Sequence, residues 1–520
     1  MSSTKGIWKV ITASSLGTLI EWYDFYIFGS LATVIAGQFF PKTNPTAALL
    51  STLATFAAGF IVRPFGALVF GRLGDLIGRK YTFLLTLIIM GGSTFAIGLV
   101  PGYESIGFAA PTIVLILRLL QGLALGGEYG GAATYVAEHA PLHRRGYFTS
   151  WIQTTATLGL FVSLGVILLT RHLLDKDQAK SISKFNEWGW RIPFLLSIIL
   201  VIISIYIRLK MKESPLFTEL KTAGKISVNP LKESFVHKQN LKIVLLALFG
   251  ATMGQGVIWY TGQFYAQSFI ENTCKVEFDQ SRMIMIWAIL FATPFFVIFG
   301  AWSDRIGRKW IMLAGMLAGI LFYRPIFSSF LSGSDTKKWD KTEMRFIKLD
   351  TKVSSHGKDS IVQVSSQYKL ADGSGFTMVL TDTLSKDRDE LKHIVQANRN
   401  ATMINKHLST SNMIYFISLV WVMIIFVTMV YGPIAAYLVE MFPTKIRYTS
   451  MSLPYHIGNG VFGGLTPFIA TLLTTLNSTN KLAGLSYPIL ISSVCLAIGA
   501  IYVKNKNDVE LFDNSLNERV

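Results

Sequence analysis

Two short polar segments recur at the same place in two hydrophobic halves of the chain. The first is GRLGDLIGRK at residues 71–80, and the second is GAWSDRIGRK at residues 300–309. Asp75 corresponds to Asp304, so the copies are offset by 229 residues. Each copy lies between two long apolar runs. A polar hairpin repeated in this way indicates one ancestral membrane bundle that was duplicated.

The composition suits a chain surrounded by lipid. Hydrophobic residues make up 51%, charged residues 15%, and the mean hydropathy is +0.44. A spanning helix needs about 20 apolar residues. Runs of that length predict an all-α integral membrane protein with twelve transmembrane helices in two six-helix pseudo-repeats. They lie near 10–36, 46–70, 81–100, 111–135, 146–170, 190–208, 243–268, 283–302, 310–331, 411–438, 448–475 and 482–503. The first run carries acids and lacks a small-residue cleavage pattern, so we expect no cleavable signal peptide.

The net charge of +17 is distributed by side of the membrane. Eight Lys and Arg residues lie from Arg208 to Lys242, both included, whereas the short external loops hold few, such as Lys42, Lys275 and Lys481. This positive-inside bias predicts that both termini are cytoplasmic, and it argues against a nucleic-acid partner. Two cysteines, one in an external loop and one in the last helix, provide neither a disulfide framework nor a metal cluster.

A second repeated motif locates an insertion. AEHAPLHRRG at 137–146 matches VEMFPTKIRY at 439–448 with an offset of 302, which exceeds 229 by 73. The extra residues fall at about 333–405, between helices 9 and 10 and on the external side. IVQVSSQYKL, ADGSG and FTMVLTDT within this stretch predict a β-hairpin around a Gly-rich turn, and DRDELKHIVQANRN predicts a short helix.

These boundaries give the predicted domain organisation. A six-helix bundle (1–209) is followed by a cytoplasmic linker (210–241), and a second bundle (242–332 and 406–504) is interrupted by a small extracytoplasmic subdomain (333–405). Residues 505–520 form a cytoplasmic tail.

The chain resembles the major facilitator superfamily, and within it the metabolite:proton symporters that carry organic acids, shikimate-like acids and betaine-type solutes. The resemblance covers the twelve helices and rests on IEWYDFYIFG (20–29), GRLGDLIGRK (71–80), RLLQGLALGGEYGG (118–131) and GQGVIWYTGQFYA (254–266). It implies the major facilitator fold and proton-coupled transport. His456, where relatives usually carry Asn, and Arg324, where they carry an apolar residue, depart from the pattern.

Four charged residues are identified well inside the predicted spans: Glu21, Asp24, Arg118 and Glu128. Each costs at least ~2.5 kcal/mol at mid-bilayer, so such a charge is a functional hypothesis by default. With a helical rise of ~1.5 Å per residue, Asp24 lies roughly 22 Å from the inner boundary and Arg118 roughly 10 Å from the outer one. These depths nearly coincide in a hydrocarbon core of ~30 Å.

We therefore expect Asp24 and Arg118 to meet across the central cavity as a proton switch, with Glu21 one turn below. The resemblance to proton-coupled relatives with an acid in helix 1 and an Arg in helix 4 supports this interpretation. Two alternatives stay open: a permanent buried ion pair, and Glu21 as the titrating acid. For Glu128 we expect a structural contact.

The two hairpins predict a gate on the cytoplasmic side. An acid such as Asp75 suits the positive N-terminal end of a helix in the opposite half, and the basic residues can pair with nearby glutamates. The alternative is that the basic residues only orient the loops. The predicted gating residues are Gly71, Asp75, Gly78, Arg79, Lys80, Glu138 and Arg145 in the first half and Asp304, Gly307, Arg308, Glu440 and Arg447 in the second.

Helix 7 provides the substrate-binding candidates. Gln255, Trp259, Tyr260, Gln263 and Phe264 fall on one helical face, whose polar tips would be costly against lipid. We expect this face to line the cavity, with contributions from Tyr23, Gln121 and Gln153. His456 is interpreted either as a ligand contact or as a packing histidine.

The leading functional hypothesis is a proton-coupled symporter of a small metabolite, in which Arg118 offers a cation to a carboxylate. A proton-independent uniporter or exchanger and a transporter-like nutrient receptor are the alternatives. The chain contains no HExxH, GxSxG or P-loop motif, so we expect neither an enzyme nor ATP drive. No cofactor or metal is predicted. We expect a monomer in the bilayer of a bacterial inner membrane.

Overall fold

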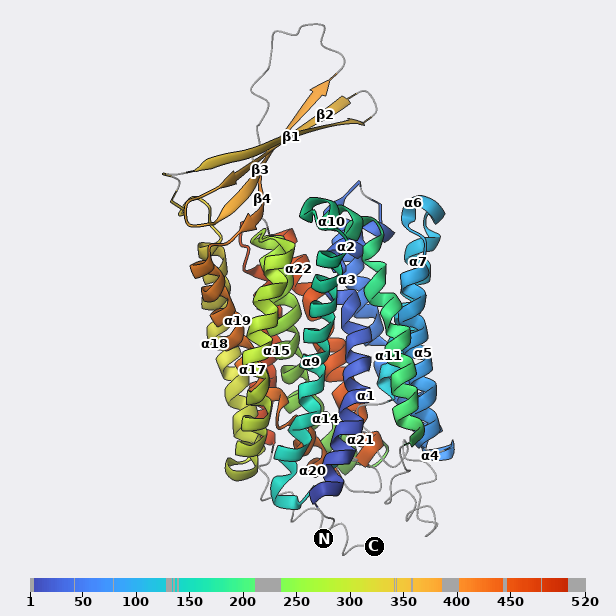
Figure 1. Ribbon diagram of the computed structural model, residues 1–520. Coiled ribbons are helices and arrows are strands. Elements are labelled where there is room, and N and C mark those ends of the chain that lie inside the picture. Colours follow the sequence, from blue (N-terminus) through green and yellow to red (C-terminus); the bar gives the residue numbers. More distant parts are fainter. Residues whose placement is uncertain are drawn as a thin grey trace, which may run out of the picture.

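The helices run side by side as one bundle, and a β-sheet projects from one end of it (Figure 1). The end that carries the sheet is called the insert end, and the opposite end the hairpin end. The computed structural model describes residues 4–503 except 42, 78, 128–132, 134–135, 138–139, 211–234, 341, 343, 357–358, 386–401, 443–446 and 478.

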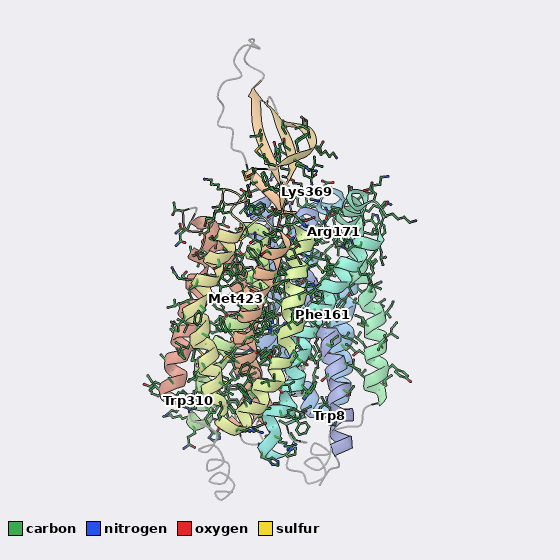
Figure 2. The ribbon with its side chains drawn as sticks, turned by 60° about the vertical axis from the view of Figure 1, so that its left-hand side comes forward. Trp8, Phe161, Arg171, Trp310, Lys369 and Met423 are labelled. Atoms are coloured by element: carbon green, nitrogen blue, oxygen red, sulfur yellow. The ribbon has the colours of Figure 1, made fainter. Side chains whose placement is uncertain are left out.

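The helices of the described residues account for the predicted spans. Nine are long and apolar enough to cross a membrane, and two more spans are helix pairs bent by 63° and 60°. The shorter apolar helix Leu84–Leu99 occupies the position of the third predicted span. Trp8 and Trp310 lie near the hairpin end of the bundle (Figure 2), the kind of position that Trp favours at a membrane surface.

The first half runs from α1 to α11. Proline, which lacks a backbone N–H, marks two helix boundaries. α3 starts at Pro45, and the Asn44 side chain caps it by accepting from the Ala47 N–H at 3.0 Å. Pro64 follows the break at Val62 between α3 and α4. The elements are α1 (Thr4–Ser30), α2 (Ala32–Phe39), α3 (Pro45–Ile61), α4 (Arg63–Ile77), α5 (Arg79–Leu99), α6 (Tyr103–Ile106), α7 (Ala109–Gly126), η1 (Leu142–Arg144), α9 (Arg145–Leu173), α10 (Gln178–Lys184), η2 (Phe185–Gly189) and α11 (Arg191–Lys210).

The second half is irregular in two spans. π-helical turns interrupt its first span and its fifth, and such turns are frequent at functional sites. The elements are α14 (Lys238–Ala247), η3 (Leu248–Thr252), α15 (Met253–Tyr260), η4 (Thr261–Tyr265), α16 (Ala266–Ser268), η5 (Phe269–Thr273), α17 (Phe278–Ile306), α18 (Arg308–Gly333), α19 (Thr410–Tyr431), α20 (Ile434–Met441), α21 (Arg447–His456), η6 (Ile457–Gly463), α22 (Thr466–Leu476), η7 (Ala483–Leu485) and α23 (Ser486–Tyr502).

The two π-helical spans pack against each other through glycine. A Cβ added to Gly256 of α15 would lie 2.5 Å from the carbonyl oxygen of Gly458 in η6. This contact leaves no room for a side chain, so the backbones of the two spans are in direct contact.

The insertion is a four-stranded antiparallel sheet in the order β1-β2-β3-β4. The strands are β1 (Arg345–His356), β2 (Asp359–Lys369), β3 (Gly375–Ser385) and β4 (Thr402–His407). β2 and β3 form the predicted hairpin, and Gly373 takes a φ of +83° in its turn. The predicted helix at 387–400 lies outside the described residues, as do residues 505–520 and most of the linker.

The last strand fixes the sheet to the bundle. The Lys406 N–H donates to the Lys275 carbonyl at 2.8 Å, and the Glu277 N–H donates to the Lys406 carbonyl at 2.9 Å. The side-chain amide of Gln280 in α17 also bonds both backbone groups of Leu408. β4 is therefore joined to the segment between the first and second spans of the second half.

Candidate functional site

Aromatic side chains from both halves meet at the centre of the bundle. Tyr26 of α1 stacks on Trp259 of α15, with ring centroids 5.3 Å apart and planes 27° apart. Phe60 of α3 contacts Tyr260 at 5.0 Å, and Phe264 lies 5.1 Å from Tyr26. The face of α15 and η4 that carries Trp259, Tyr260 and Phe264 therefore packs on the first half. We define the interface cluster as Trp22, Tyr26, Phe60, Arg63, Trp259, Tyr260, Phe264 and His456.

Arg63 is the charged member of the interface cluster. It is 1% exposed, and its guanidinium carbon lies 4.1 Å from the Phe60 ring centroid and 5.2 Å from that of Trp22. Arg63 also lines a small cavity with Tyr455 and His456 of the second half. Its Nε and Nη2 have no hydrogen-bond partner in the protein. These two atoms form the edge of a guanidinium that binds a carboxylate bidentately.

Polar atoms of the second half are also unpartnered, among them those of His456, which shares a small cavity with Arg63. Trp259 Nε1, both amide atoms of Gln263 and both ring nitrogens of His456 are buried without a hydrogen bond in the protein. Gln255 accepts a 2.6 Å bond from Asn459, which leaves its own amide nitrogen unpartnered. Buried polar groups are normally paired, so the unpartnered atoms of Arg63, Trp259 and His456 within the interface cluster call for an explanation.

The expected ion pair between Asp24 and Arg118 is not formed, which corrects the prediction for this conformation. Arg118 donates to the carbonyl oxygens of Phe25 and Phe56 at 3.3 and 3.4 Å and to Gln121 Oε1 at 2.6 Å. Both carboxylate oxygens of Asp24 are buried without a hydrogen bond. Phe25 faces Arg118, its ring 4.0 Å from the guanidinium carbon. Its neighbour Asp24 points elsewhere, because successive helical residues are about 100° apart.

The other predicted residues divide between the interface and the first half. Glu21 lines a small cavity with Arg63 and His456. Tyr23 instead donates to the Pro193 carbonyl at 2.9 Å, and Gln121 donates to Thr94 at 2.7 Å, so both are engaged inside their own bundle. Gln153 is buried in α9.

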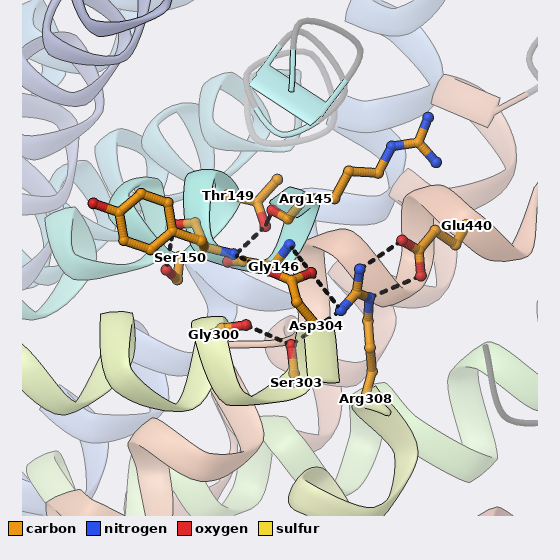
Figure 3. A network of polar contacts seen from close by, with 10 residues as sticks. Arg145, Gly146, Thr149, Ser150, Gly300, Ser303, Asp304, Arg308 and Glu440 are labelled. Carbon is orange, nitrogen blue, oxygen red and sulfur yellow. Dashed lines mark hydrogen bonds and ion pairs between the residues drawn. The ribbon is translucent and has the colours of Figure 1, made fainter. Parts of the chain in front are cut away.

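Of the two hairpins predicted to form a gate, the one in the second half, which contains Asp304 and Arg308, has its side chains described. Asp304 of α17 accepts hydrogen bonds from the Gly146 and Tyr147 N–H groups of α9, each at 2.9 Å (Figure 3). An acid of one half thus caps the first turn of a helix in the other, as expected from the helix dipole. A Cβ on Gly146 would lie 2.4 Å from the Gly300 carbonyl, so the two helices touch here.

Arg308 connects this cap to a neighbouring helix. It binds Glu440 of α20 bidentately at 2.8 and 2.7 Å and Asp304 at 2.9 Å, while Arg145 points away from Asp304 (Figure 3). Gly307 takes a φ of +92° between α17 and α18. The side chains of Asp75, Arg79, Lys80, Glu138 and Arg447, the residue Gly78 and the surroundings of Gly71 and Glu128 lie outside the described part of the chain.

The two halves also meet at the insert end. Arg171 of α9 forms an ion pair with Asp279 of α17 at 2.9 Å. Arg282 of α17 forms an ion pair with Glu271 at 2.9 Å and donates to the Ser30 carbonyl of α1. Contacts between the halves therefore exist at both ends, and the aromatic rings pack between them.

Sequence reasoning missed Arg63, although it stands inside the predicted span 46–70. The statement that four residues were the intramembrane charges was wrong for this reason. IVRPFG, with a cation within an apolar run, was the available signal. Arg171 and Arg282 were missed because they lie near span ends, where a charge is common.

The comparisons with known proteins identify the family. The chain is 31% identical over 472 residues to the inner membrane metabolite transport protein YhjE of Escherichia coli, covering 90% of this chain and 88% of that protein. The chain belongs to the major facilitator superfamily. Residues 9–227 also match the family described as "Sugar (and other) transporter".

Other relatives and solved structures agree with this membership. The chain is 30% identical over 471 residues to the alpha-ketoglutarate permease of E. coli, covering 90% and 88% of the two chains. It is 34% identical over 334 residues to the proline/betaine transporter of E. coli, covering 61% and 64%. A partially occluded inward-open structure of the xylose transporter XylE from E. coli superposes with a TM-score of 0.64 at 15% identity, covering 96% and 98%.

Several predictions are thereby confirmed. This major facilitator superfamily protein is a multi-pass membrane transporter of the twelve-helix fold, and it is not an enzyme. Its substrate is a small molecule.

Proposed function

We propose that this transporter carries a small carboxylate-bearing metabolite together with a proton, by alternating access. The observation that supports it best is the unpartnered edge of Arg63 in the interface cluster. A buried guanidinium edge without a hydrogen-bond partner is costly, and a carboxylate that binds both Nε and Nη2 would compensate it. Arg118, the cation considered from the sequence, is instead engaged by two carbonyls and Gln121.

Other unpartnered groups suit the rest of such a solute. Trp259 Nε1 and His456 of the interface cluster, and the Gln263 amide on the same helical face as Trp259, supply donors and acceptors for hydroxyl or keto groups. The rings of Trp22, Tyr26 and Trp259 supply apolar surface. The similarity to an alpha-ketoglutarate permease is in keeping with a carboxylate solute.

Asp24 is the proposed proton carrier. A buried carboxylate without a partner is costly when charged, so a proton on Asp24 suits the closed conformation. Opening toward water would allow its release. Glu21, which lines the small cavity with Arg63 and His456, is the competing acid.

We further propose that the hairpin end faces the cytoplasm of a bacterial cell and the insert end faces outward, in accord with the distribution of Lys and Arg. The contact of Asp304 (α17) with α9 would then be part of the inner gate, and the contacts of Arg171 and Arg282 part of the outer gate. The protein would act as a monomer without a cofactor.

A transport screen tests the proposal. Purified full-length protein is reconstituted into liposomes preloaded with 2-oxoglutarate, glycine betaine or xylose, and counterflow of each labelled solute is measured. We expect exchange of 2-oxoglutarate or a related acid and none of xylose. Exchange of xylose alone would refute a carboxylate substrate. Exchange of glycine betaine alone would show that the substrate is a zwitterion instead of an organic acid.

A further inference from the structure

The sheet covers a large cavity at the insert end. The cavity has a volume of about 1100 Å³ and lies between the sheet and the ends of α2, α9, α10 and η5. Arg171, on the floor, and Lys369, on the sheet, lie on its two sides (Figure 2). We call this cavity the vestibule. It lies above the Arg171–Asp279 and Arg282–Glu271 pairs that join the halves at this end.

The charges that line the vestibule do not cancel. Its two acids are already paired, Glu271 with Arg282 at 2.9 Å and Glu277 with His407 at 2.9 Å. Arg171 is paired with Asp279. Lys275 and Lys369 also line the vestibule, and the ion pairs among the described residues include neither of them. The lining is therefore net positive whether or not His407 is protonated, because Arg171, Lys275 and Lys369 outnumber Glu271 and Glu277.

The Lys275 side chain is exposed, like that of Lys369, so both ammonium groups are open to solvent in the vestibule. Partial desolvation lowers the pKa of Lys275, the nearby Lys481 lowers it further, and Glu271 opposes this. Its backbone has a φ of +62°, a left-handed conformation that costs energy for a residue with a side chain. The hydrogen bond from the Lys406 N–H to its carbonyl helps to hold this conformation, so the insert itself helps to fix Lys275 at the vestibule.

Aromatic side chains form part of the vestibule wall. Tyr368 of β2 and Phe376 of β3 face each other across the strand pair, with ring centroids 5.5 Å apart, and both line the cavity. Cations beside an apolar wall suit an organic anion better than a bare inorganic one.

We propose that the vestibule is a second binding site, in which Lys275 and Lys369 hold the carboxylate solute before the insert end opens. This inference rests on the proposed carboxylate substrate. A positive cavity at the entrance raises the local concentration of an anion and its rate of entry. The insert thus serves capture, while Arg63 serves the central site.

A thiol reporter in the vestibule tests the proposal. Thr377 lines the vestibule, and both native cysteines are buried, so Thr377→Cys supplies a selective label site. Proteoliposomes of the full-length variant are treated with a membrane-impermeant maleimide at constant ionic strength. We expect 2-oxoglutarate to slow labelling about fivefold, and glycine betaine or KCl to have no effect. Equal protection by inorganic phosphate would overturn the assignment to an organic anion.

Two lysine variants make the test specific. Lys275→Gln or Lys369→Gln, added to the reporter, should abolish protection and raise the transport KM about fivefold without changing kcat. Lys348→Gln is the control, because Lys348 is an exposed residue of β1 that does not line the vestibule. Folding of Lys275→Gln is checked by unchanged labelling without solute.

The outcomes separate the two proposals. Protection that is absent while 2-oxoglutarate is transported would overturn the vestibule site alone. Protection that persists in both lysine variants would also overturn it. Absence of carboxylate transport with protection intact would overturn the proposed function and leave the vestibule as an anion site.

Discussion

At the residue scale, direction on a helix decides what a buried charge can do. Asp24 and Phe25 are adjacent, yet only Phe25 faces Arg118. The depth estimate from the sequence concerned height along the bundle and said nothing of rotation about the helix axis. Arg63, three residues past Phe60 on the neighbouring span, reaches the boundary between the halves instead and lines a small cavity there with Tyr455 and His456.

Arg63→Gln should weaken solute binding more than it slows turnover. Loss of a bidentate charged contact costs about 1.5–3 kcal/mol, which is roughly a 10- to 150-fold rise in Kd. Binding of 2-oxoglutarate is measured by calorimetry, with Arg305→Gln as the control, since Arg305 is an exposed arginine at the hairpin end. An unchanged Kd in Arg63→Gln would show that the carboxylate binds elsewhere.

At the scale of elements, the α9–α17 contact is the simplest candidate for a gate. Asp304→Ala removes the acceptor for two N–H groups of α9. A capping contact is worth about 1–2 kcal/mol, so the closed state at the hairpin end should lose roughly 5- to 30-fold in population. We expect a large change in kcat and a small change in Kd, because a gate acts on the equilibrium between states.

Labelling of Ser150→Cys reports opening at the hairpin end, since Ser150 is buried against Gly300 in the closed contact. Its rate should rise in Asp304→Ala and stay constant in Arg305→Ala. A Kd that changes as much as kcat, with constant labelling, would count against the gate.

The attachment of β4 should depend on pH. The hydrogen bond between His407 and Glu277 raises the pKa of His407 and lowers that of Glu277. The Glu277 contribution is present above its unfolded pKa of about 4.3 and is lost as pH falls through the lowered folded value. The His407 contribution is present below its unfolded pKa of about 6.5 and is lost as pH rises through the raised folded value.

β4 should therefore be attached most firmly between about pH 4.3 and 6.5 and less firmly above. The effect is small, because the His407 side chain is 53% exposed. Hydrogen exchange of the β4 amides, corrected for intrinsic rates, should show less protection at high pH. His407→Gln should remove this trend, and a trend that survives in it must have another source.

At the scale of the whole molecule, the sheet between α18 and α19 projects from the helical bundle, and the offset between the repeated motifs predicts that it is an insertion. Deleting residues 336–400 and closing with a short Gly/Ser linker keeps β4, whose contacts with 275–280 join it to the bundle. We expect a monodisperse protein that still transports, with a KM raised by about fivefold through loss of Lys369. Loss of all uptake by the correctly inserted deletion variant would make the sheet part of the transport cycle.

The sequence was sufficient for the fold and for one ion pair at the hairpin end. Twelve apolar runs, the internal repeat and the β-hairpin follow from hydropathy, offsets and turn residues, which are local properties. The pairing of Arg308 with Glu440 also followed, because acid and base recur together in both halves. The polar and aromatic face of α15 and η4 could also be found in the sequence, because the spacing of its residues is a property of a single helix.

The partners of the buried charges could not be derived in this way. They depend on how α1, α4 and α7 are rotated against each other, and hydropathy contains no such information. The vestibule likewise depends on how the sheet is attached to the bundle. Lys275 and Lys369 are 94 residues apart in the chain, and they share a cavity because β4 is joined to the segment that contains Lys275.

Uphill uptake by Asp24→Asn tests the central claim, proton-coupled transport, most directly. Proteoliposomes with an acidic exterior are given the best-exchanged acid of the screen, and accumulation and counterflow are measured for the wild type, Asp24→Asn and Glu21→Gln. The substitution mimics a permanent proton on Asp24, so Asp24→Asn should retain counterflow and lose accumulation against a gradient. Proton-driven accumulation that persists in Asp24→Asn and disappears in Glu21→Gln would contradict the account and move the proton site to Glu21.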